Sequence, residues 1–239
     1  MNGPEWPGEP EPTASPLPED RRPEPAALGP APWEDPERPR LAGYFQTLRE
    51  VLRRPALFFA RPAGGGPGEP FAFGLITGTT GGLLGLFWWT LLLLSTSHGL
   101  RSAVELPRCD FLPGAAGVLT VGMALIPLAI LIKLALASLC LWAAAALLGA
   151  RAGWAPLWRL CCYATAAAAL AVVPFLGSLL AVPLALFILH QGLRGALGMS
   201  GGRALGTLAI FLCLQTLVAA ALLGGGFLAL LSLGLLFWG

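Results

Sequence analysis

Acidic residues are missing from the second half of this chain. No Asp or Glu follows Asp110, although the 239 residues include 13 acidic ones. Catalysis by paired carboxylates and metal sites rich in carboxylates both need such side chains, so this half can hold neither kind of site. Its only charged residues are Lys133, Arg151, Arg159, Arg194 and Arg203.

Charge is scarce in the chain as a whole. Only 12% of residues are charged and 56% are hydrophobic, with a mean hydropathy of +0.71, whereas soluble domains carry about 25% charged residues. The composition therefore predicts an integral membrane protein. A net charge of +2 is too small to indicate a nucleic-acid partner. Lys133 is the only lysine, and this bias toward arginine points to a bacterial origin and an inner-membrane location.

Groups for metal binding, redox chemistry or nucleophilic catalysis are also lacking. The five cysteines form no C-x-x-C pair and have no His at ligand spacing. The glycine-rich loop at residues 64–68 lacks the Lys and Ser/Thr of a phosphate-binding loop. We expect no cofactor, no metal site and no enzymatic activity.

Two segments precede the apolar regions. Residues 1–40 are rich in Pro and Glu and predict a disordered, acidic, cytoplasmic tail. Residues 41–62 predict an amphipathic helix on the membrane surface, with Arg49, Arg53 and Arg54 toward anionic headgroups. Its apolar arc consists of Tyr44, Phe45, Leu48, Val51 and Leu52. An alternative is that this helix packs on the protein's own spans, with Phe58 and Phe59 as a plug.

Residues 71–238 predict an all-α bundle of five membrane-spanning helices, since about 20 apolar residues cross a bilayer. Residues 157–191 are too long for one crossing, and Pro174 to Gly177 offers a turn between two short helices. Residues 111–150 read as a lead-in to about Gly117 followed by a helix kinked at Pro127. The other expected spans are residues 71–96 and residues 204–238, the latter with a weak point at Gly224.

Arginines favour alternate connections between these spans. They cluster before the first span, between the second and third, and between the fourth and fifth. The positive-inside rule then places the N-terminus in the cytoplasm and the C-terminus outside. Trp154 and Trp158 fit an aromatic belt at the cytoplasmic face.

The order of these parts resembles the prokaryotic branch of the Ypt-interacting protein (YIP) family over residues 41–225. W-E at Trp33 and Glu34 precedes F-Q-T-L-R-E-V-L-R-R-P-A-L-F-F, and later come L-C-C-Y, V-V-P-F-L-G and H-Q-G-L-R-G. The residues that carry the resemblance are Arg54, Pro55, Phe58, Phe59, Tyr163, Pro174, Gly177 and Arg194.

The resemblance implies a five-span protein without an established activity. Eukaryotic members of the family associate with Rab-type GTPases and carry a D-L-Y-G-P motif before the spans and a G-Y motif in the third. The first motif is absent here, and Cys162 stands where the second has glycine, which counts against a GTPase partner.

Three features of the spans have two interpretations each. Lys133 is either an anion or coupling site or a lysine that snorkels to the interface. His190 is either a pH-sensitive group or an interfacial residue. Gly74, Gly78 and Gly82 allow close helix packing, either within the chain or in a homo-oligomer.

The function that we expect is a non-enzymatic membrane organiser or trafficking-type adaptor, with the lipid bilayer and other proteins as partners. The alternative is a small transporter or channel subunit. In that case the Pro and Gly residues of the spans would break the helices, as in the broken helices at transporter binding sites.

Overall fold

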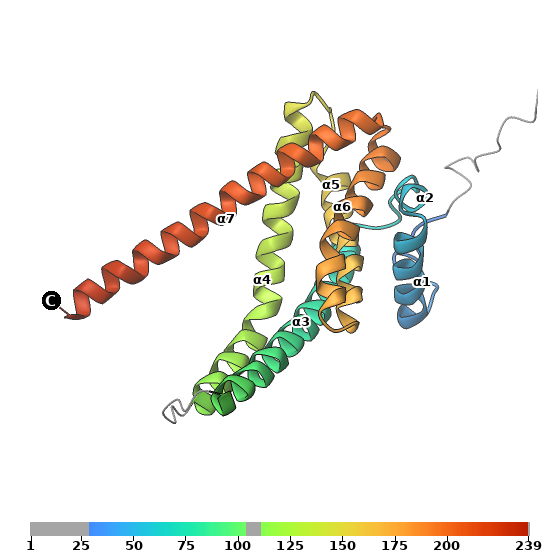
Figure 1. Ribbon diagram of the computed structural model, residues 1–239. Coiled ribbons are helices and arrows are strands. Elements are labelled where there is room, and N and C mark those ends of the chain that lie inside the picture. Colours follow the sequence, from blue (N-terminus) through green and yellow to red (C-terminus); the bar gives the residue numbers. More distant parts are fainter. Residues whose placement is uncertain (1–28, 104–110, 239) are drawn as a thin grey trace, which may run out of the picture.

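A computed structural model describes residues 29–103 and 111–238, and this part of the chain is helical with no strand (Figure 1). The prediction for residues 1–28 lies outside the described residues. The helices are α1 Arg40–Arg53, α2 Pro55–Phe59, α3 Gly68–Ala103, α4 Phe111–Leu147, α5 Trp154–Ala164, the 3-10 helix η2 Thr165–Val172, α6 Leu176–Leu197 and α7 Gly201–Trp238.

Five helical stretches in the described part of the chain are long and apolar enough to cross a membrane. They are Gly68–Leu93, Thr120–Leu147, Trp154–Val172, Leu176–Leu197 and Gly201–Gly224. The third stretch joins α5 to η2 and so counts as one crossing. The predicted all-α fold with five spans is confirmed, and the protein is a multi-pass membrane protein.

The Pro and Gly residues that were expected to kink or weaken the long spans do not end a helix. Helix α4 runs without a break through Gly117 and Pro127, α6 through Pro183, and α7 through Gly224. In lipid, an opened backbone has no water to replace its hydrogen bonds, so a continuous helix is favoured even where Pro or Gly weakens it.

The turn between η2 and α6 is confirmed where the sequence placed it. Phe175 has a φ of 57°, which is uncommon for a residue other than glycine. Gly177 follows because a side chain there would overlap the carbonyl oxygen of Leu170. Pro174 and Gly177 therefore serve the reversal of the chain, and the third and fourth spans form an antiparallel pair.

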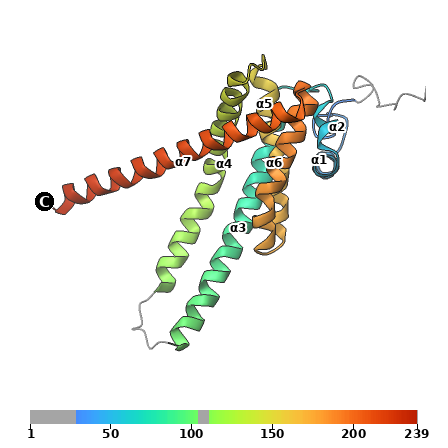
Figure 2. The same cartoon turned by 45° about the horizontal axis from the view of Figure 1, so that its top comes forward.

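The helices meet around α5 (Figures 1 and 2). Helices α3 and α4 run side by side, the pair formed by α5–η2 and α6 lies along α3, and the C-terminal half of α7 extends away from the others. Helices α1 and α2 lie on the α6 side of the bundle. The core holds the buried side chains of Phe58, Phe73, Leu141, Leu157, Leu160, Tyr163, Ile188 and Leu193.

The glycines of α3 are used within the chain. A methyl group at Gly74 would lie 3.0 Å from the carbonyl oxygen of Cys162, and one at Gly78 would lie 2.8 Å from the Ile130 side chain. At Gly82 the neighbour is Ile126, at 3.0 Å. Small residues at all three positions thus serve the close approach of α3 to α4 and α5. Whether they also serve a homo-oligomer stays a prediction.

Because the number of spans is odd, the two ends of the chain should lie on opposite sides of the membrane. Reporter fusions at Gly239 and at the N-terminus test this, and the arginine distribution predicts that only the N-terminal reporter is cytoplasmic. Fusions at Arg151, between α4 and α5, and at Ser200, between α6 and α7, serve as controls, since both loops should share the side of the N-terminus. Two reporters on one side would mean that one of the five helices does not cross.

Candidate functional site

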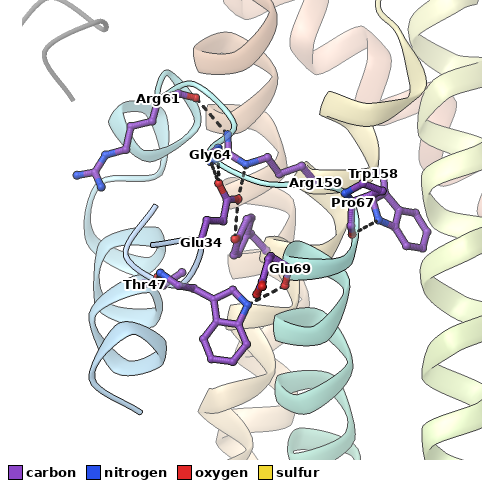
Figure 3. A network of polar contacts seen from close by, with 10 residues as sticks. Glu34, Thr47, Arg61, Gly64, Pro67, Glu69, Trp158 and Arg159 are labelled. Atoms are coloured by element: carbon purple, nitrogen blue, oxygen red, sulfur yellow. Dashed lines mark hydrogen bonds and ion pairs between the residues drawn. The ribbon is translucent and has the colours of Figure 1, made fainter. Parts of the chain in front are cut away.

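The carboxylate of Glu34 is buried in the protein and is fully hydrogen-bonded (Figure 3). Its Oε1 lies 2.9 Å from Nε of Arg159 and accepts a hydrogen bond of 2.9 Å from the Tyr163 hydroxyl. Its Oε2 accepts from the backbone N–H of Gly64 at 2.9 Å and from Nη2 of Arg159 at 3.4 Å. Only 1% of the Glu34 side chain is exposed. This ion pair joins a residue of the N-terminal segment to the third span.

The guanidinium of Arg159 uses three of its five N–H donors within the described part of the chain. Besides the two bonds to Glu34, its Nη1 donates to the carbonyl oxygen of Arg61 at 3.1 Å. Its central carbon lies 5.7 Å from the ring centroids of both Phe58 and Tyr163, within reach of a cation–π interaction. Arg159 therefore connects the N-terminal segment, the loop after α2 and the aromatic core.

Trp33 fixes the segment that presents Glu34. Its backbone N–H donates to Oγ1 of Thr47 at 2.9 Å, and its indole N–H donates to the carbonyl oxygen of Glu69 at 2.7 Å. Gly43 lets this segment approach α1, because a methyl group there would lie 2.6 Å from the carbonyl oxygen of Pro32. Residues 29–40 thus fold against α1 and α3, and the prediction of a disordered tail up to residue 40 is wrong for this part.

Composition misled the prediction at this point. The average composition of residues 1–40, rich in Pro and Glu, indicates too little apolar surface for a folded segment. Trp33 nevertheless supplies a large apolar side chain, 8% exposed, next to a carboxylate that has a buried partner. The W-E pair in the sequence was the signal that could have identified the ordered part.

An aromatic cluster surrounds the ion pair. The Tyr163 ring lies 4.9 Å from that of Phe58 and 5.0 Å from that of Phe73, and Trp33 packs 6.2 Å from Phe73. Phe58 and Phe59 are 1% and 3% exposed. Such contacts contribute about 0.5–1.5 kcal/mol per pair beyond area burial, so the cluster stabilises the polar network that it encloses.

Helix α1 packs on the chain's own spans along much of its predicted apolar arc. Val51 is buried, Tyr44, Leu48 and Leu52 contact the core, and the Tyr44 hydroxyl lies 3.0 Å from Oγ1 of Thr77. Phe45 instead remains 58% exposed. These contacts fit the alternative in which Phe58 and Phe59 plug the bundle, while the placement of α1 at a membrane surface stays a prediction.

The residues predicted for membrane-surface contact are on the outside of the structure. Arg49 and Arg53 of α1 and Arg54, which caps α2, are exposed. Arg194, in the last turn of α6, is also exposed, and Pro55 is the first residue of α2. Of the residues that carry the family resemblance, Phe58 and Tyr163 contact the buried ion pair, and Phe59 packs on both of them.

Lys133 and His190 form no hydrogen bond or ion pair with Glu34 or Arg159. Lys133 is exposed and lines a cavity of about 350 Å³ together with small residues of α3, η2 and α6. Leu131, two residues earlier, lines a second cavity with Trp158 and Arg159, which brings this part of α4 to the same end of the bundle as the ion pair. His190 lies 3.4 Å from the carbonyl oxygen of Gly201, a contact that links α6 to α7.

Comparisons with protein-family models, with curated proteins and with solved structures find no match to this chain. The resemblance to the YIP family therefore stays a prediction.

Replacing Glu34 by Gln should destabilise the protein because it leaves the Arg159 charge buried without a counter-charge. Breaking a buried pair in this way costs about 3–5 kcal/mol. Thermal unfolding of the purified chain in detergent measures the effect. Glu37→Gln is the matched control, since Glu37 is exposed and forms no ion pair among the described residues. Equal stability of the two variants would show that the Glu34 pair contributes little.

Proposed function

We propose that this protein is a non-enzymatic membrane adaptor of the YIP type, which holds a cytoplasmic N-terminal segment at a fixed place on its transmembrane bundle. The observation that carries the proposal is the buried ion pair between Glu34 and Arg159. A buried pair is costly to form in a membrane protein and often adds specificity rather than stability. Here it specifies where the N-terminal segment leaves the bundle.

The surroundings of the ion pair support a role in recruitment. The exposed Arg49, Arg53 and Arg54 lie on the elements that follow the anchored segment. Near an anionic membrane surface each arginine contributes about 1 kcal/mol. The adaptor would thus combine attachment to the cytoplasmic leaflet of a bacterial inner membrane with an acidic tail available to other proteins. A GTPase partner is not part of this proposal.

The cavity at Lys133 favours a second candidate, a small transporter or channel subunit. Six elements, α3, α4, α5, η2, α6 and α7, contribute to its lining, and a lysine in such a position can contact an anion. No Asp or Glu occurs in the lining, so a solute would have to supply the counter-charge. If the protein is a transporter, Lys133 would be the residue that binds the anionic solute.

One set of variants separates the two candidates. Cross-linking in native membranes followed by identification of partners should give the same partners for the natural chain, Glu37→Gln and Lys133→Met. Glu34→Gln should lose partners while still running as an intact membrane protein in size-exclusion chromatography. Anion uptake into proteoliposomes should stay at background for every variant.

Two results would contradict the adaptor. The first is a saturable anion uptake that Lys133→Met abolishes, which would establish the transporter instead. The second is an unchanged set of cross-linked partners in a folded Glu34→Gln variant, because the anchored segment would then have no part in recruitment.

A further inference from the structure

A cavity with an aromatic wall lies beside the ion pair, and Arg159 is part of its lining. Its volume is about 800 Å³, within the range of about 300–1,000 Å³ typical of ligand sites. Trp158 stacks between Phe71 and Trp154, with ring centroids 5.9 and 6.0 Å apart and interplanar angles of 23° in both pairs. Ala63, Gly65, Gly66 and Pro67 of the loop after α2 also line the cavity.

This wall has the properties of a surface that binds proline-rich peptide. Such peptides dock in grooves lined by aromatic rings, because their extended polyproline conformation loses little entropy on binding. Trp154 is 42% exposed, and its indole N–H has no acceptor within the described part of the chain, so it is available to a peptide carbonyl. The indole N–H of Trp158 donates to the carbonyl oxygen of Pro67 at 3.2 Å and holds the wall in place.

Charge on the described surface is complementary to the first 28 residues of the chain. Four ion pairs use Glu34, Asp35, Glu50 and Glu69. No carboxylate pairs, in the part of the chain that the structure describes, with the exposed arginines Arg49, Arg53, Arg54, Arg151, Arg194 and Arg203. Residues 1–28 contain six acidic and two basic side chains, a net charge of −4, together with eight prolines.

The first 28 residues are also attached at the edge of this cavity. Pro30 packs against Gly64, where a side chain would overlap the proline ring, and the next residues of that loop, Gly65 and Gly66, line the cavity. A tethered segment that can reach its site acts at an effective concentration in the millimolar range. Twenty-eight residues span up to about 90 Å when extended, so reach is not limiting and weak intrinsic binding suffices.

We infer that the aromatic cavity is a docking site for the chain's own N-terminal segment, residues 1–28. Its prolines pack on Trp154 and Trp158, which line the cavity. A partner that binds this segment or this cavity must then displace the intramolecular contact.

The test uses a labelled synthetic peptide of residues 1–28 and the purified protein in uncharged detergent, with fluorescence anisotropy as the measurement. The peptide should bind saturably to a variant that lacks residues 2–28. It should bind at least about tenfold more weakly to the full chain, whose own segment competes at millimolar effective concentration. In the truncated background Trp154→Ala should weaken binding about tenfold. Trp89→Ala should have no effect, because Trp89 is 60% exposed on α3 and does not line the cavity.

Two further arms keep the result specific. A peptide with its prolines replaced by alanine retains the charge and should bind more weakly than the natural sequence, and vesicles with anionic phospholipid should not displace the natural peptide. Equal binding of the peptide to the full chain and the truncated variant would overturn the inference. So would an unchanged affinity in the folded Trp154→Ala variant, or complete displacement by anionic lipid, which would identify a lipid site.

Discussion

The pairing of Glu34 with Arg159 is the constraint on which the arrangement of this end of the protein depends. Arg159 is 8% exposed within the bundle, and a buried guanidinium requires a counter-charge. No carboxylate follows Asp110, so the partner has to come from the N-terminal part of the chain. Trp33 holds the segment that carries Glu34 in place, and the backbone N–H of Gly64 donates a further hydrogen bond to the carboxylate.

This dependence links the first and third spans through a segment outside both. Trp33 binds the first turn of α3 through Glu69, and Glu34 binds α5 through Arg159. The exposed ion pair between Arg40 and Glu69, at 2.8 Å, adds a second connection on the same side, although exposed pairs contribute only about 0–1 kcal/mol. The buried pair is therefore the connection that carries the adaptor proposal.

The span count and the turn at Pro174 to Gly177 could be predicted from the sequence because both follow from length and local backbone chemistry. A bilayer fixes the length of an apolar helix, and a proline and a glycine within four residues, Pro174 and Gly177, mark a reversal. The effect of Pro127 and Gly224 could not be predicted from local propensity, which points to a kink and a weak point there. The requirement for internal hydrogen bonds in lipid keeps α4 and α7 continuous at both residues.

The candidate site itself was missed for a different reason. The partners Glu34 and Arg159 are 125 residues apart, and no local pattern connects them. The distribution of charge did hold a signal: an arginine at the start of a span, in a half of the chain without acids, must find its partner upstream. The cavity wall could not be predicted for the same reason. Trp154 and Trp158 were predicted as part of an interfacial belt, but the stacking of Trp158 on Phe71 depends on how α3 packs against α5.

Amide hydrogen exchange of the N-terminal segment tests most directly whether it is anchored. The backbone N–H groups of Trp33 and Gly64 are bonded to Thr47 and Glu34, so both should exchange at least about a hundredfold more slowly than in an unstructured peptide, which corresponds to about 2.7 kcal/mol of opening free energy. Their protection should fall together in Arg159→Met, while the amides of α7 keep theirs. Exchange of Trp33 and Gly64 at the rate of an unstructured peptide in the natural chain would contradict an anchored N-terminal segment.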